Sequence, residues 1–175
     1  MGLLSRLGGL FSRELDMAPA ARLQRARKMG FEVDRPLYHG TTNQFDEFSG
    51  PTWLAREKEY ADEFQWATKD EIEKGIATPT VIQAYARGRL KTVDNDTIEQ
   101  LGYRPDEIEV LRRQGFDGVQ NRDQVLIFDP ANIRRTDAAF DPAKSGSGKL
   151  LAAIPAAIGG GLLSRWALQP EDYQV

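Results

Sequence analysis

The chain has 175 residues, with 23 Lys or Arg, 26 Asp or Glu, a single histidine, no cysteine and a formal net charge of −3. This length suits one domain with some residues left over for terminal segments. Without cysteine there are no disulfides or thiolate zinc sites, and one histidine is too few for a structural transition-metal site, so no metal is predicted. The charge balance gives no overall basic field, so no nucleic-acid partner is predicted either.

Residues 1–15 place leucines at roughly helical spacing, with Arg6 and Arg13 between them, which predicts an amphipathic segment. Gly2 resembles the start of a myristoylation signal, but Arg6 stands where that signal needs Ser or Thr. The apolar run is interrupted and lacks a small-residue cleavage site, so no secretory signal is predicted. We expect this segment to dock on the protein itself or on a partner. Attachment to a membrane surface is the less favoured alternative.

The next elements are a helix and a short strand. Asp16 is a candidate N-cap for a helix that has Pro19 in its first turn and ends at Gly30. The stretch 37–42 holds the only histidine, His39, which we expect near the end of a short strand.

Four elements are predicted in the middle of the chain. Residues 52–55 follow a Gly-Pro turn as a short strand, and residues 57–73 read as one helix with an apolar face. Alternating side chains predict a strand over residues 81–86. The polar residues 94–96 are read as a turn.

The last part of the expected domain combines a helix with a buried strand. Residues 105–114 read as a helix closed by Gly115, followed by a turn at 116–119 that leads into a strand. Residues 125–128 are an unbroken apolar run, which predicts a central strand covered on both faces and stopped by Pro130. Short strands interleaved with helices indicate an α+β domain, with bounds at residues 16–142.

Beyond residue 142 the composition changes. Residues 143–149 are rich in Ser and Gly and predict a flexible linker. The tail, 150–175, starts with an apolar run that is too short for a comfortable membrane span and is broken by Pro155 and three glycines. We expect residues 150–168 to contact a virion, another copy of the chain or a larger assembly, with membrane contact as the weaker alternative.

Several segments together resemble ADP-ribosyltransferases of the His-Tyr-Glu type, the group of diphtheria toxin and the poly(ADP-ribose) polymerases. The nearest resemblance is to the transferase domains of polyvalent phage proteins, and it covers about residues 16–142. The segments that carry it, in chain order, are Ala26-Arg27-Lys28-Met29-Gly30-Phe31, Tyr38-His39-Gly40-Thr41, Trp53-Leu54-Ala55, the helix with Ala61 and Phe64, Gly115-Phe116-Asp117-Gly118-Val119 and Gln124-Val125-Leu126-Ile127-Phe128-Asp129-Pro130.

The resemblance implies a split pair of small antiparallel sheets with NAD, the substrate, in the cleft between them. It implies that His39 hydrogen-bonds a ribose hydroxyl of NAD. Gly40 would grip the nicotinamide amide through its backbone, with Thr41 beside it among the NAD contacts. Trp53 matches the signature tyrosine that stacks on the nicotinamide ring, and Phe64 matches an aromatic residue on the other face of that ring.

Gln124 occupies the place where the family usually has its catalytic glutamate. Its carbonyl oxygen can accept a hydrogen bond from the ribose 2′-hydroxyl, but it brings no negative charge. Losing one preorganised electrostatic contact of this kind costs on the order of 10²–10³ in rate. Asp123 does not replace it, because alternation along a strand turns its side chain to the opposite face. Catalytic roles are therefore expected for His39, Trp53 and Gln124.

The resemblance implies a mono-ADP-ribosyltransferase that cleaves NAD at the nicotinamide–ribose bond and transfers ADP-ribose to a macromolecule, with a host protein as the expected acceptor. Phage context implies a toxin-like effector in the virion or in the cytoplasm of a bacterial host. The alternative is a weakened or inactive transferase fold that serves as a structural part of a virion. Both apolar termini favour that alternative.

Overall fold

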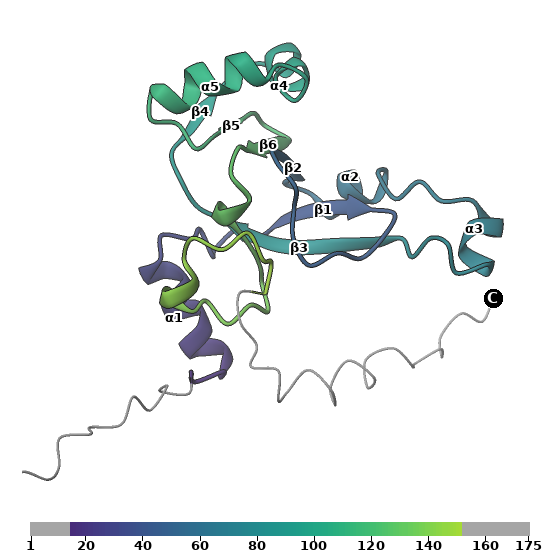
Figure 1. The fold of residues 1–175 in the computed structure, drawn as a ribbon, viewed down its shortest axis with the longest axis horizontal. Helices are drawn as coiled ribbons and strands as arrows, with labels where there is room; N and C mark the ends of the chain where they lie inside the picture. Colours follow the sequence, from purple (N-terminus) through teal and green to yellow (C-terminus); the bar gives the residue numbers. More distant parts are fainter. Residues whose placement is uncertain (1–14, 152–175) are drawn as a thin grey trace, which may run out of the picture.

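One mixed sheet of seven strands runs through residues 15–151, the part of the chain that the computed structural model describes (Figure 1). The strand order is β4-β5-β6-β2-β1-β3-β7, and only β4 and β5 pair in parallel. The predicted α+β class is confirmed. The strands are β1 (Leu37–Thr41), β2 (Thr52–Ala55), β3 (Thr80–Ala86), β4 (Leu90–Thr92), β5 (Gly118–Gln120), β6 (Gln124–Ile127) and β7 (Ile133–Arg135).

The sheet has a weak junction between β1 and β2. These strands share one registered pair, Tyr38 with Ala55, whereas β2 and β6 share four pairs and β1 and β3 share five. The expectation of two separate sheets is therefore wrong for this chain, since all seven strands belong to one hydrogen-bonded sheet. The two halves nevertheless meet over a very short length of backbone.

Helices cover the two ends of this sheet. The last two α-helices lie together beside β4 and β5 (Figure 1), and their apolar side chains pack on β5 and β6 through a cluster that includes Ile98, Leu111 and Leu126. At the other end the first helix packs with Ala26 on Phe140. The helices are α1 (Pro19–Lys28), α2 (Lys58–Asp62), α3 (Lys69–Glu73), α4 (Asn95–Leu101) and α5 (Pro105–Arg113), with short 3₁₀ turns at Pro130–Asn132 and Pro142–Lys144.

Strand β6 is the centre of the core. Val125 and Ile127 belong to one apolar cluster, and Leu126 and Phe128 belong to the cluster formed with α4 and α5. The prediction that this run is a strand covered on both faces is confirmed.

Two local predictions were wrong. Residues 57–73 form two short helices, α2 and α3, because Thr68 starts a second helix: its hydroxyl accepts from the N–H of Glu71, and the Glu71 carboxylate accepts from the N–H of Thr68. Residues 94–96 do not form a simple turn. Asp94 is the N-cap of α4, and its side chain accepts from the N–H of Thr97.

The packed domain continues to Leu150. Leu150 is fully buried in the core cluster of the sheet, and its N–H donates to the carbonyl of Asp46. The buried guanidinium of Arg134 donates to the carbonyls of Lys144, Ser145 and Ser147, and burial beside Arg87 lowers the pKa of Arg134 to about 10. Residues 143–149, predicted as a flexible linker, are therefore held against the sheet.

The terminal predictions fall largely outside the described range: residues 1–14 and 152–175 carry the amphipathic segment and almost all of the apolar tail. None of the helices between residues 15 and 151 has both the length and the apolarity needed to cross a bilayer. In the same range no group of three or more His, Cys, Asp or Glu side chains is placed to hold a metal ion.

Candidate functional site

A cavity of about 550 Å³ lies where β1, β2 and β6 meet the segments around α2 and α4. This volume falls within the range of roughly 300–1,000 Å³ that is usual for small-molecule sites. Of the six residues predicted to contact NAD, the structure brings five together in its wall: His39, Gly40, Trp53, Phe64 and Gln124. They come from positions as far apart as 39 and 124, so the fold and not the local sequence makes them neighbours.

His39 is held in one orientation by the backbone of the next strand. Its Nδ1 lies 2.8 Å from the carbonyl oxygen of Trp53. Because a carbonyl only accepts, Nδ1 carries the proton, and Nε2 of the neutral ring is left as an acceptor. The rings of Phe45 and Phe48 pack edge-on against the imidazole, and burial lowers the pKa of His39. The histidine is therefore a neutral hydrogen-bond acceptor at neutral pH.

Gly40 is required by backbone packing. A Cβ placed on Gly40 would lie 1.8 Å from the carbonyl oxygen of Ala61 in α2 and 3.2 Å from the Cβ of Phe64. The resemblance explains the glycine by the space that a bound ring needs. In this chain the approach of α2 already excludes any side chain there, and only the backbone groups of Gly40 are left to meet a ligand.

Trp53 connects the cavity to α4. Its indole is partly buried, and a Cβ placed on Gly102, directly after α4, would lie 2.7 Å from the indole. The missing side chain at Gly102 lets the end of α4 rest on Trp53. The helix thereby forms part of the cavity wall.

Aromatic side chains follow α2 along the open side of the cavity. Phe64 is 45% exposed, meets Tyr60 edge-on with ring centroids 5.5 Å apart, and stacks with Trp66 at 6.0 Å. Phe64 lies just after α2 and not within a long helix as predicted. It still lines the cavity together with Tyr60 and Trp66.

Gln124 is fixed at both its backbone and its side chain. Its N–H donates to Oδ1 of Asn121 at 2.6 Å, and its Nε2 donates to the hydroxyl of Tyr60 at 2.5 Å. Within the described residues its Oε1 has no hydrogen-bond partner. The carboxamide therefore keeps an acceptor available to a ligand.

Two predicted neighbours do not line the cavity. The Thr41 hydroxyl donates to the carbonyl of Asn43 at 3.0 Å and is used in the turn after β1. Asp123 is exposed and lines a separate hollow of about 240 Å³ that adjoins the cavity at Gln124. The expectation that strand alternation turns Asp123 to the face opposite Gln124 is not met, because Asp123 precedes β6 and lines this hollow together with Gln124. Asp123 does not line the cavity itself.

The sequence reasoning missed several lining residues. Tyr60 lies four residues before Phe64 on the predicted apolar face, and that spacing could have assigned both residues to the site. Glu99 and Tyr103 belong to the segment of α4, and no helix was predicted there. The missed lining residues with polar or aromatic side chains are Tyr38, Tyr60, Trp66, Glu99 and Tyr103.

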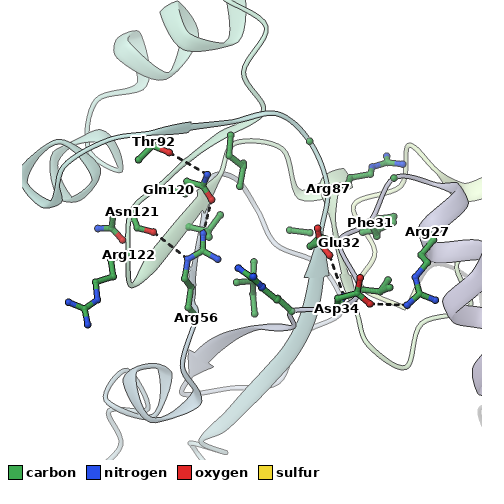
Figure 2. A pocket seen from close by; sticks show the side chains of 18 residues that line it. Arg27, Phe31, Glu32, Asp34, Arg56, Arg87, Thr92, Gln120, Asn121 and Arg122 are labelled. Carbon is green, nitrogen blue, oxygen red and sulfur yellow. Dashed lines mark hydrogen bonds and ion pairs between the residues drawn. The ribbon is translucent and has the colours of Figure 1, made fainter.

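A larger groove of about 1,190 Å³ lies on the other face of β2 and β6. Figure 2 shows the side chains that line it. Val125 and Arg56 line this groove, whereas their chain neighbours Gln124 and Ala55 line the smaller cavity. Three of its five arginines serve the fold: Arg27 pairs with Asp34, Arg56 donates to Gln120, and Arg87 donates to Asn132 and to three backbone carbonyls. The groove contains none of the predicted site residues, so the smaller cavity is the candidate site.

No family model, curated protein or solved structure matches the chain.

Proposed function

We propose that the protein is a mono-ADP-ribosyltransferase that cleaves NAD at the nicotinamide–ribose bond and transfers ADP-ribose to a macromolecular acceptor. The observation that carries the proposal is the convergence of an imidazole, two aromatic rings and a carboxamide on one cavity of about 550 Å³. These are the residue types that the sequence resemblance assigns to NAD, and they come from three strands and the end of a short helix.

The chemistry suits a site without a metal. Nicotinamide leaves a positively charged pyridinium as a neutral ring, so its departure needs no general acid. Trp53 and Phe64 are the rings that would hold the charged pyridinium, each contributing about 0.5–2 kcal/mol by cation–π attraction. That attraction weakens as the charge leaves the ring, so it favours binding more than rate.

Orientation and rate are assigned to the polar residues. Nε2 of His39 is the acceptor for a ribose hydroxyl, because Nδ1 is engaged with Trp53. The free Oε1 of Gln124 is the acceptor for the ribose 2′-hydroxyl, because Nε2 is engaged with Tyr60. A contact to this hydroxyl that strengthens as positive charge grows on the ribose lowers the barrier to glycosyl transfer.

Two exposed aromatic side chains at the cavity support a macromolecular acceptor. Trp66 is 77% exposed and Tyr103 is 89% exposed, and both line the cavity. Exposed aromatic side chains are enriched at protein interfaces. A protein acceptor that covers them would bring its nucleophile to the ribose.

The test uses NAD labelled in the adenylate portion and a bacterial lysate. Wild-type protein should label macromolecules, and His39→Ala should abolish the label. Release of free nicotinamide, measured in parallel, separates transfer from hydrolysis. If the protein binds NAD but neither labels macromolecules nor releases nicotinamide, the proposed enzymatic activity is wrong. That result would favour the alternative of an inactive transferase fold with a structural role.

A further inference from the structure

We infer that Glu99 is the general base of the proposed transfer reaction, accepting the proton of the incoming nucleophile. This inference rests on the proposed function. Gln124 can accept a hydrogen bond, but an amide does not take a proton at neutral pH. Some other group in the cavity must do so, unless the nucleophile arrives already deprotonated.

Glu99 supplies the one carboxylate among the described residues that line the cavity. The other titratable groups are worse placed or worse suited. His39 uses Nδ1 for Trp53, and its Nε2 is assigned to the ribose of NAD. The tyrosines offer only phenolic hydroxyls, which donate hydrogen bonds more readily than they accept a proton. Within the part of the chain that the structure describes, no hydrogen bond or ion pair engages the Glu99 carboxylate.

Three contacts hold the face of α4 that carries Glu99 against the cavity. Asn95, Glu99 and Gly102 are separated by four and three residues, so they share one face of α4 and its C-terminal extension. At one end of this face, Oδ1 of Asn95 accepts from Nδ2 of Asn121 at 2.9 Å, and Oδ1 of Asn121 accepts from the N–H of Gln124.

At the other end of the same face, Gly102 rests on the indole of Trp53. Along this face, Glu99 therefore lies between Asn95, which bonds to the turn before Gln124, and Gly102, which packs on Trp53. It lines both the cavity and the adjoining hollow of about 240 Å³, and Gln124 and Tyr60 line both of these spaces as well. A nucleophile that reaches the ribose through the adjoining hollow passes this carboxylate.

The step balances as a substitution. The nucleophile X–H forms a bond to C1′ of the nicotinamide ribose while the C1′–N1 bond breaks. The electron pair of that bond goes to the ring nitrogen, which releases neutral nicotinamide, and the proton of X–H goes to the Glu99 carboxylate. General-base assistance of this kind contributes roughly 10²–10⁴ in rate.

The experiment compares Glu99→Gln with Asp96→Asn, which removes the same charge from the same helix at a position outside the cavity. Glu99→Gln should keep the NAD dissociation constant of wild type and lower the transfer rate by roughly 10²–10⁴. Asp96→Asn should leave the transfer rate unchanged.

Sodium azide gives a second readout, since the azide anion attacks C1′ without losing a proton. Adding azide to Glu99→Ala should restore NAD cleavage and yield ADP-ribosyl azide, and this rescue would exclude a purely structural role. Equal transfer rates in wild type and Glu99→Gln would overturn the assignment of Glu99 and leave the transferase proposal standing. No NAD consumption by wild type would overturn both.

Discussion

Nδ1 of His39 donates to the carbonyl oxygen of Trp53 at 2.8 Å, so a side chain on β1 is bonded to the backbone of β2 where these strands share one registered pair. This bond supplements the backbone pairing at the junction of the sheet. It also fixes the tautomer of the ring. One contact thereby serves both the fold and the proposed NAD site.

Two substitutions separate these roles of His39. In His39→Asn the carboxamide nitrogen occupies roughly the place of Nδ1 and can keep the bond to Trp53, but no group replaces Nε2. We expect the free energy of unfolding of this variant to lie within about 1 kcal/mol of the wild-type value, because the hydrogen bond is retained. NAD binding should be lost, as measured by calorimetry. His39→Ala should lose binding and also about 1–3 kcal/mol of stability. Full NAD affinity in His39→Asn would contradict the role of Nε2.

The stability of the protein should fall in mild acid because of His39. Burial lowers the pKa of His39 below the ordinary value of 6.5, so the unfolded chain takes up a proton at a pH where the folded protein does not. The contribution of this residue is complete above about pH 6.5 and is lost as the pH falls through the lowered pKa. Urea unfolding of wild type and His39→Asn between pH 7.5 and 5 measures the effect. Parallel curves for the two proteins would contradict it.

Gln124→Glu should raise the rate of NAD cleavage. The phenolic O–H of Tyr60 can donate to the new carboxylate, so the contact with Tyr60 is kept with its direction reversed. The added negative charge faces the ribose and should increase the rate by about 10- to 100-fold, a part of the 10²–10³ that such contacts supply. Gln120→Glu is the matched control, since it makes the same change on β5 in the arginine-lined groove. Equal rates in wild type and Gln124→Glu would contradict the assignment.

Gly40→Ala should destabilise the protein by about 3 kcal/mol or more, because the added methyl meets the backbone carbonyl of Ala61, which cannot rotate away. Gly50→Ala is the control. Nothing lies within 4 Å of a Cβ at Gly50, so its unfolding free energy should change by less than about 1 kcal/mol. Thermal and urea unfolding of both variants checks the prediction. A stable Gly40→Ala protein would show that α2 can move away from β1.

Leu150→Ala should lower the free energy of unfolding by about 2–4 kcal/mol, as expected for a fully buried leucine in a packed core. Val110→Ala, at a half-exposed position on α5, should lower the free energy of unfolding by less than about 1 kcal/mol. Urea unfolding compares the two. A small effect at Leu150 would mean that the domain ends near residue 142, as the composition predicted.

Much of the fold follows from local patterns. The unbroken apolar run at Val125–Phe128 predicts a central strand, and the structure confirms it because each face of β6 packs on a different cluster. The split of residues 57–73 was missed because the capping box at Thr68 lies inside a segment of high helical propensity. Helix α4 was missed because Asp94 favours a turn and an N-cap by the same side-chain chemistry.

Only part of the candidate site follows from the sequence. The motif residues His39, Trp53 and Gln124 meet in one cavity, and their strand positions explain that convergence. Glu99 had no signal of its own, because its place depends on Asn95 bonding to Asn121 and on Gly102 resting on Trp53. Both contacts are tertiary. The reason for Gly40 also required the fold, since the carbonyl that excludes a side chain belongs to α2.

The short junction between β1 and β2 has a thermodynamic consequence. A dinucleotide seated across it would touch both halves of the sheet and raise the free energy of opening by RT ln(1 + [L]/Kd). Amide hydrogens of β1 and β2 should then exchange with solvent more slowly as NAD is added, while those of α1, which packs in a separate apolar cluster with Phe140, keep their rates. The fraction of protein bound to NAD and the protection of these amides from exchange would therefore rise with the same dependence on NAD concentration.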